Sequence, residues 1–427
     1  MTVEAIVFLF SDEETARDVA AKVTTDDHSA KILGDVLAGG PFRPGQVFNL
    51  CEQLHINRTD DNEVFINTIL AKAEDRAMAQ FGSGYWADHW DYYLDLIQAY
   101  LGVFPDGEEA LMYDTELRYF FSTATVRPRS EKYVLDFTFD GTSKHVIQLD
   151  STYFDTGKAD EQEKFRDSNT GLIGIDASWQ RTKSGEPFMS SPIAKLFLLV
   201  SIKFVTRDAW GMGIEYEGGR PGWLDSMNGL PGMVGSGMPE TYELYLLMKY
   251  VKKVVDQYDR DVIVPAELGV MITAIEDALD TLDAARFEEP EELPYDVPQP
   301  LFEYWDAAAT AREKYRGKVE YYFSGKETTY TAKEVSDMTG RWLAEIETGM
   351  ERAMKFGTKG FGDDGTSGIP PSFFSYDVTD WELNGGHNAL GLPLVDAKAM
   401  KVGKFPLFLE VRFPWCGSDS VKRRDEN

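Results

Sequence analysis

Cysteine and histidine are scarce in this chain of 427 residues. It holds two cysteines, Cys51 and Cys416, which lie far apart, and five scattered histidines. A protein zinc site needs closely spaced Cys or His ligands, so this pattern argues against one and predicts no metal. The spacing of the two cysteines does not by itself indicate a disulfide.

Basic residues are also few. Lys and Arg number 43 against 72 Asp and Glu, which gives a formal net charge of −29 at pH 7. Nucleic-acid binding requires a basic surface that replaces counterions along the phosphate backbone. The one basic run, Lys422 to Arg424, lies in a polar tail (418–427) that we expect to be flexible. We therefore expect no nucleic-acid partner.

Long hydrophobic runs are missing. The longest, 194–205, is interrupted by Lys195 and Lys203 and is too short to span a bilayer. The apolar run 5–10 follows no basic region and precedes three acidic residues, unlike a signal peptide. We therefore expect a soluble, cytoplasmic protein without a membrane partner, and the sequence leaves a homodimer open.

Helical periodicity dominates what is present. Apolar residues at spacings of three and four, together with Pro and capping signals, predict a set of helices. They cover residues 13–23, 64–80, 86–103, 192–205, 239–258, 264–282, 300–315 and 331–356. Alternating residues around Asp140-Gly141 predict a β-hairpin over 133–149, and 404–413 is strand-like. Helices joined by long loops favour a mainly α fold, and an α/α barrel fits this pattern.

The loop from Glu215 to Glu243, and above all its part from Arg220 onward, has an unusual composition. Seven glycines and three prolines surround Trp223, Asp225 and Asn228. Glycine permits unusual backbone angles and close approach of a ligand, so we favour a binding loop over an ordinary long turn. Cleavage of a glycosidic bond needs a carboxylic acid that protonates the leaving oxygen, and Asp225 has apolar neighbours that suit this role. A hydrolase then needs a second carboxylate, whereas a phosphorylase uses inorganic phosphate and needs cationic or N–H donors.

Several motifs resemble a known enzyme family. The run Trp223-Leu-Asp-Ser-Met-Asn228 resembles the Trp-Asn-Asp-Gly-Met-Asn element of the inverting cellobiose phosphorylase family of glycoside hydrolases. The surrounding residues, from Arg220-Pro-Gly to Met238-Pro-Glu240-Thr-Tyr-Glu243, look more like the β-1,2-oligoglucan phosphorylase branch. So does Gly82-Ser-Gly-Tyr-Trp-Ala-Asp-His-Trp-Asp-Tyr-Tyr-Leu-Asp-Leu-Ile97. The resemblance covers about 69–414.

The resemblance implies a six-hairpin α/α barrel in which Asp225 is the general acid and phosphate is the nucleophile. The family's N-terminal β-sandwich is absent, so we expect residues 1–427 to be its C-terminal catalytic portion, either a separate short protein or a truncated gene. Residues 1–60 would then be a partial or irregular start. Leu224 replaces the family's Asn, and the family's phosphate-placing His-Ala and Ser-Trp-Leu-Thr-Gly-Thr elements have no clear match.

Other residues are candidates for sugar or phosphate binding. Aromatic platforms beside carboxylates suit a sugar subsite, although core tryptophans and a capping Asp would give the same helix pattern. Tyr376 is equally a core candidate, His387 a surface one, and Arg220 a simple ion-pair partner of Glu215 or Glu217. The substrate-binding candidates are Trp86, Asp88, His89, Asp91, Asp150, Arg220, Trp223, Asn228, Glu240 and Tyr376; the phosphate-binding ones are Arg220 and His387.

Three functions remain open at this point. The first is inverting phosphorolysis of β-linked gluco-oligosaccharides, preferably β-1,2-linked, to α-glucose 1-phosphate, with phosphate as co-substrate and no cofactor. The second is an inverting β-glucan hydrolase on the same scaffold, with Asp88, Asp91 or Asp150 as base. The third is a non-catalytic glycan-binding fragment.

Overall fold

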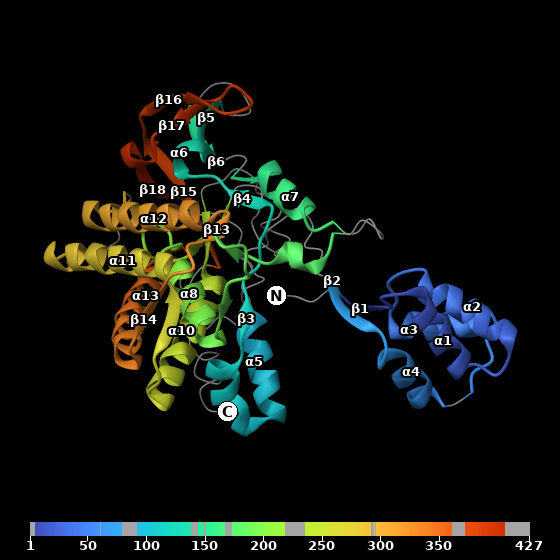
Figure 1. Cartoon of the computed structure of the whole chain (residues 1–427). Coiled ribbons are helices and arrows are strands. Elements are labelled where there is room, and N and C mark those ends of the chain that lie inside the picture. Colours follow the sequence, from blue (N-terminus) through green and yellow to red (C-terminus); the bar gives the residue numbers. More distant parts are fainter. Residues whose placement is uncertain are drawn as a thin grey trace. The chain divides into compact units, whose positions relative to one another are not determined.

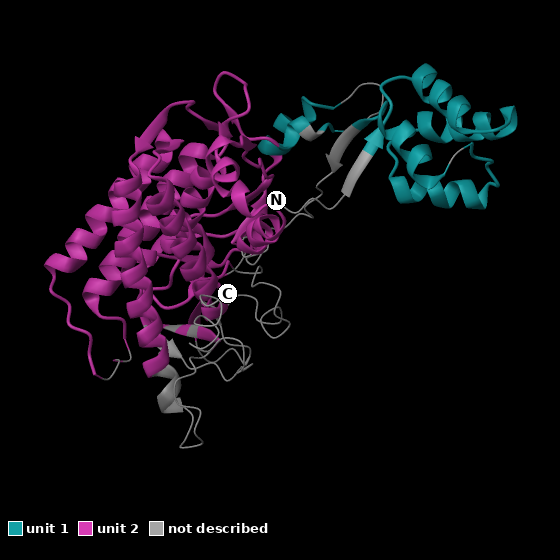
Figure 2. Cartoon of the chain, turned by 90° about the horizontal axis from the view of Figure 1, so that it is seen from below, with its two compact units in different colours: residues 1–82, 157–178 teal, residues 83–156, 179–427 magenta. Residues whose placement is uncertain are grey.

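The computed structural model describes residues 5–59, 61–78, 92–137, 144–148, 151–166, 173–217, 235–291, 294, 296–360 and 372–405. The chain divides into two compact units (Figure 2). Unit 1 comprises 1–82 and 157–178, and unit 2 comprises 83–156 and 179–427. Helix is the dominant secondary structure, which confirms the mainly α prediction.

Unit 1 is a small helical unit with its own core. Its helices are α1 (Glu13–Val23), α2 (Asp27–Ala38), α3 (Pro44–Gln53), α4 (Asn62–Leu70) and α7 (Thr156–Glu163), and strands β1 (Ala5–Leu9) and β2 (Glu74–Met78) pair antiparallel. Asp12 and Asp26 cap α1 and α2 because each side chain accepts a backbone N–H of the first turn. Inward-facing residues of the four helices α1 to α4, such as Ala20, Leu33 and Phe65, form the core.

The long helices of unit 2 lie side by side around a large core (Figure 1). The five longest in this group are α8 (Pro192–Phe204), α10 (Met238–Tyr258), α11 (Ala266–Ala284), α12 (Gln299–Val319) and α13 (Ala332–Gly360). At its centre Trp342 is fully buried and stacks on Phe197 and Phe204. Two shorter helices, α5 (Tyr92–Val103) and α6 (Arg129–Lys132), precede them.

Short strands of unit 2 form two four-stranded sheets. One has the order β10 (Ile214–Glu215), β11 (Gly235–Gly237), β15 (Phe373–Asp380), β18 (Lys401–Phe405). The other has the order β16 (Leu383–His387), β17 (Pro393–Val395), β5 (Tyr133–Phe137), β6 (Lys144–Gln148). Unit 2 also contains two-stranded sheets. They pair β3 (Leu117–Arg118) with β9 (Met189–Ser190), β4 (Ala124–Val126) with β7 (Thr152–Phe154), β8 (Arg181–Thr182) with β13 (Tyr322–Phe323), and β12 (Val262–Pro265) with β14 (Glu327–Tyr330).

Most sequence-based element predictions agree with the structure. The predicted helix 13–23 coincides with α1, and α8, α10, α11, α12 and α13 match theirs to within a few residues. Helix α13 begins with a capping box, because Thr331 N–H donates to Glu334 and Glu334 N–H donates to the Thr331 hydroxyl. The hairpin is confirmed as β5 and β6, which pair antiparallel. Of the predicted strand 404–413 only its first two residues lie in the described part, at the end of β18.

One helix prediction was wrong over part of its length. The helix expected over 64–80 ends at Leu70, and residues 74–78 form β2 instead. Backbone pairing with β1, which is more than sixty residues away in sequence, outweighs the local helical pattern there. The predicted domain boundaries, one barrel over 1–427 with an irregular start over 1–60, stay a prediction; residues 13–53 form the regular helices α1 to α3.

The cap of α2 gives a testable pH effect. Asp26 accepts hydrogen bonds from Ser29 N–H and, at 3.0 Å, from the Asn57 amide, and these lower its pKa to about 2. Because the folded-state pKa lies below the ordinary value near 3.9, the cap stabilises unit 1 above about pH 4 and loses this effect as the pH falls towards 2. Carboxyl NMR titration should give a pKa of about 2 for Asp26.

Asn57→Ala removes one donor and should raise that pKa. Asp26→Asn, which does not titrate, should flatten the loss of unit 1 stability between pH 4 and 2. An Asp26 pKa near 3.9 in the unsubstituted protein would contradict the prediction.

Candidate functional site

Most of the predicted site residues lie outside the described residues. These are Trp86, Asp88, His89, Asp91, Asp150, Arg220, Trp223, Asn228 and the predicted acid Asp225. The structure does describe Glu240, Tyr376 and His387, and it describes both ends of the glycine-rich loop. The site is therefore built from the loop ends and the side chains around them.

The two ends of the glycine-rich loop lie beside each other. Strand β10 leads into it and β11 leads out of it, and the two pair antiparallel with Glu215 opposite Ser236. Tyr216 N–H donates to Gly235 O at 3.1 Å and closes the pair. In sequence, Asp225 is eight residues after Glu217 and ten before Gly235. The loop that carries the predicted acid thus starts and ends at one place in unit 2.

A small cavity of about 10 Å³ lies at the base of this loop. This is close to the smallest volume that holds one water-sized group. Its polar lining includes Gln148, Asp208 and Glu215, and its aromatic lining includes Tyr133, Trp305 and Tyr376. The cavity therefore combines carboxylates with rings, as a sugar contact requires.

Asp208 is the main hydrogen-bond acceptor in this cluster. The residue is 3% exposed, and its carboxylate accepts from backbone and hydroxyl donors on three segments of the chain. The donors are Trp210 N–H at 2.9 Å, Met212 N–H at 3.0 Å, Gly213 N–H at 2.7 Å, the Ser236 hydroxyl at 2.6 Å and the Tyr376 hydroxyl. Five donors compensate for the burial of one negative charge.

The Tyr376 hydroxyl is held as a donor. Burial and the neighbouring Asp208 carboxylate raise the pKa of Tyr376 well above 10.0, so it stays protonated. The hydroxyl also lies 3.1 Å from Ser236 Oγ. Tyr376 is 8% exposed and lines the cavity, so it belongs to the core, and its role in substrate binding stays a prediction.

Glu240, in the first turn of α10, holds the outgoing end of the loop. Its carboxylate accepts the Tyr216 hydroxyl at 3.0 and 3.1 Å, and it is 5% exposed. This contact passes over Gly237, where an added Cβ would lie 1.9 Å from the Tyr216 hydroxyl. Glycine is therefore required at position 237, and Glu240 acts on the loop end through Tyr216.

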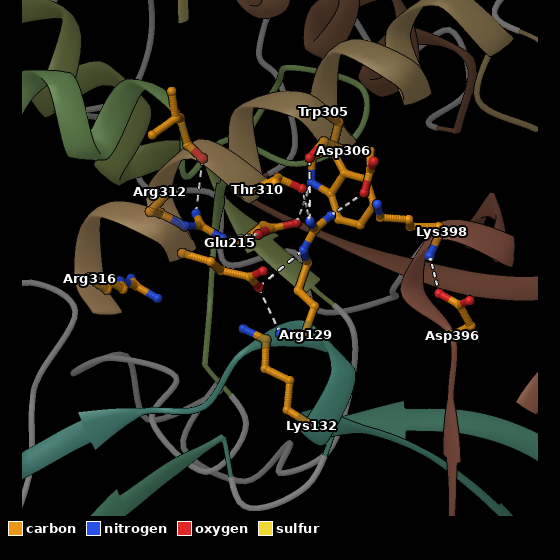
Figure 3. Close-up of polar contacts among 12 residues, drawn as sticks. Arg129, Lys132, Glu215, Trp305, Asp306, Thr310, Arg312, Arg316, Asp396 and Lys398 are labelled. Atoms are coloured by element: carbon orange, nitrogen blue, oxygen red, sulfur yellow. Dashed lines mark hydrogen bonds and ion pairs between the residues drawn. The ribbon is translucent and has the colours of Figure 1, made fainter. Parts of the chain in front are cut away.

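Glu215, at the incoming end, is a buried carboxylate that lines the cavity. It accepts Trp305 Nε1–H at 2.8 Å through Oε1, and its Oε2 lies 3.5 Å from Arg312 (Figure 3). Burial raises the pKa of Glu215 despite the nearby cations Arg312 and Lys132. Burial therefore favours the protonated form of Glu215.

Two residues further, Glu217 is bound by cations. Lys132 Nζ donates to it at 2.6 Å, and Arg316 lies at 3.7 Å. Burial alone would raise its pKa, but Lys132, Arg316 and Arg312 together outweigh burial and lower it, so Glu217 is ionised. Among the described residues, the cationic partners of these glutamates are Lys132, Arg312 and Arg316. Arg220, whose alternative role was to pair with one of them, lies outside the described residues.

Arg129 fastens α6, which carries Lys132, to α12. It is 4% exposed and donates to Glu313 at 3.1 Å and Asp306 at 2.9 Å (Figure 3). Its guanidinium also lies over the Trp305 ring, 5.2 Å from the centroid. The two carboxylates outweigh burial and raise the pKa of Arg129. Trp305 is thus held by Arg129 over its ring and by Glu215 at its Nε1–H.

His387 lies apart from this cluster. It ends β16, its side chain is exposed, and it is not among the residues that line the cavity. Within the described ranges, no group of three or more His, Cys, Asp or Glu is arranged to hold a metal ion. In the same part of the chain, no helix is both long and apolar enough to cross a membrane.

Compared with the models of known protein families and with curated proteins, the chain matches none. The resemblance to inverting phosphorylases therefore stays a prediction that depends on the motifs quoted above.

Sequence reasoning missed the residues that build the loop base. They are Lys132, Gln148, Asp208, Trp305 and Arg312. The local sequence did not mark them as buried: Arg207 precedes Asp208, and Glu313 and Lys314 follow Arg312. Several of their partners lie far away in sequence, as Tyr376 does from Asp208.

The buried pair Lys132–Glu217 gives a stability prediction. Lys132→Met leaves Glu217 buried with a weaker partner at 3.7 Å, so the free energy of unfolding should fall by about 3 kcal/mol. Adding Glu217→Leu removes the isolated charge and should restore most of that loss. Urea unfolding of the single and double variants measures both values.

Lys333→Met is the control, since its ion pair with Asp337 is exposed and should contribute less than about 0.5 kcal/mol. Equal destabilisation by Lys132→Met and Lys333→Met would refute a structural role for the buried pair.

Proposed function

We propose that the protein is an inverting phosphorylase of β-linked gluco-oligosaccharides, with β-1,2 as the preferred linkage. Asp225 is the general acid, inorganic phosphate is the nucleophile, and the products are α-glucose 1-phosphate and a shortened chain. The observation that carries the proposal is the place of the glycine-rich loop: it starts and ends at a buried cavity lined by carboxylates and aromatic rings.

The anchoring of the loop supports a catalytic role for Asp225. A general acid must be held within hydrogen-bond reach of the leaving oxygen, and a loop gives this precision only if its ends are rigid. The incoming end is fixed through Glu215 and Glu217, and the outgoing end through Ser236. Both ends are tied by charge-assisted hydrogen bonds, which are stronger than neutral ones.

The surroundings of the loop base suit an uncharged sugar and an anionic co-substrate. Trp305 and Tyr133 offer ring surfaces at the cavity, and Lys132 and Arg316 place positive charge where the loop begins. Phosphorolysis needs such cations, whereas hydrolysis needs a carboxylate base. The five long helices α8 and α10 to α13 around one core support our proposal of an α/α barrel.

The test is product formation from a defined substrate. Purified protein incubated with sophoro-oligosaccharides and inorganic phosphate should release α-glucose 1-phosphate, detected by phosphoglucomutase coupling or ³¹P NMR. Asp225→Asn cannot donate the proton and should lower kcat by at least about 100-fold. Asp261→Asn, an exposed Asp before β12, is the matched control and should leave the rate unchanged.

Three outcomes would count against the proposal. Reducing sugar released without phosphate identifies the hydrolase. Glycan binding without turnover under either condition identifies a binding fragment. An unchanged rate for Asp225→Asn removes Asp225 from the acid role.

A further inference from the structure

The cavity at the loop base contains an acceptor without a donor. Gln148, the last residue of β6, is 3% exposed and lines the cavity. Among the described residues, no donor lies within hydrogen-bond distance of its Oε1 atom. Buried acceptors are nearly always paired, and an unpaired one destabilises the fold. A ligand that brings a hydrogen-bond donor to Gln148 would remove this penalty.

The charge of the cavity selects against an anion. Asp208 and Glu215 both line it, and its described lining includes no Lys or Arg side chain. The five donors of Asp208 come from the protein itself. The Asp208 carboxylate repels phosphate, whereas a neutral donor meets acceptors at Gln148 and Glu215.

The size of the cavity limits what enters it. At about 10 Å³ it takes one water-sized group and not a ring. The aromatic lining, from Tyr133 and Trp305, is itself buried and makes part of the cavity wall apolar. A single hydroxyl group attached to a larger uncharged ligand meets these limits.

We propose that this cavity binds one hydroxyl group of an uncharged glycosyl unit, which donates its proton to Gln148 Oε1. Gln148 is then a specificity-determining residue: it selects a sugar that carries a hydroxyl at one ring position. The choice of glucose as the sugar rests on the proposed function, whereas the preference for a neutral donor rests on the lining alone.

The test combines a substitution with a deoxy scan. Methyl β-D-glucopyranoside and its 2-, 3-, 4- and 6-deoxy analogues are titrated into the full chain and followed by NMR. One analogue should bind about tenfold more weakly than the parent, the effect of one lost hydrogen bond of about 1.4 kcal/mol. Gln148→Leu should bind the parent about tenfold more weakly and should no longer distinguish that analogue.

Matched variants separate recognition from stability. Gln180 is also a buried glutamine of unit 2, and it donates to Val319 O outside the cavity. Gln180→Leu should retain the full deoxy discrimination. Gln148→Met, which keeps the length of the side chain, repeats the test if Gln148→Leu does not fold.

The outcomes are decisive in both directions. Equal binding of all deoxy analogues, or discrimination that survives in Gln148→Leu and Gln148→Met, overturns the proposal. So does weaker binding of inorganic phosphate in Gln148→Leu with unchanged glucoside binding, since the cavity would then hold an anion. Failure of the proposed phosphorolysis is a separate outcome. A chain that forms no glucose 1-phosphate can still lose its discrimination of one deoxy analogue when Gln148 is replaced.

Discussion

The loop base depends on one buried carboxylate. Asp208 follows α8 and accepts hydrogen bonds from the next turn of chain, from Ser236 on β11 and from Tyr376 on β15. Hydrogen bonds to a charged acceptor contribute about 1.5 to 3 kcal/mol each, and leaving the charge unpaired would cost more. Segments up to 168 residues apart in sequence are thereby held at one point. The wall of the cavity and the outgoing end of the loop share this single support.

The incoming end of the glycine-rich loop is held mainly by buried ion pairs. Glu215 and Glu217 are held by Trp305 and Arg312 on α12 and by Lys132 on α6. Buried ion pairs rarely add much net stability, because desolvation offsets the attraction. Breaking one is nevertheless strongly destabilising, so such pairs penalise any alternative placement of the strand. For this reason we expect Lys132→Met to lower the free energy of unfolding and the double variant with Glu217→Leu to recover most of it.

Local sequence signals were sufficient for the helices and the loop, and insufficient for the contacts. Helices α1 and α10 could be predicted from caps, proline and apolar spacing, all within a few residues. Strand β2 was missed because its partner β1 is distant in sequence. The same reason hid the loop base: Lys132 and Glu217 are 85 residues apart, and Asp208 and Tyr376 are 168 apart. The glycine-rich loop could be recognised from its own residue composition. The sequence around Gln148 has no feature that marks it as part of a cavity.

The loop base is divided by charge, and this bears on how two substrates could be accommodated. The cavity side presents Asp208, Glu215 and the acceptor of Gln148, and the beginning of the loop presents Lys132 and Arg316 beside Glu217. The Asp208 carboxylate repels an anion from the cavity side, whereas a neutral hydroxyl suits it. At the beginning of the loop, the buried Lys132 is paired with Glu217. In an inverting reaction the nucleophile and the acid act on opposite faces of the sugar. Under the proposed function, this separation of acceptors from cations would assign the sugar and the phosphate to different parts of the loop base.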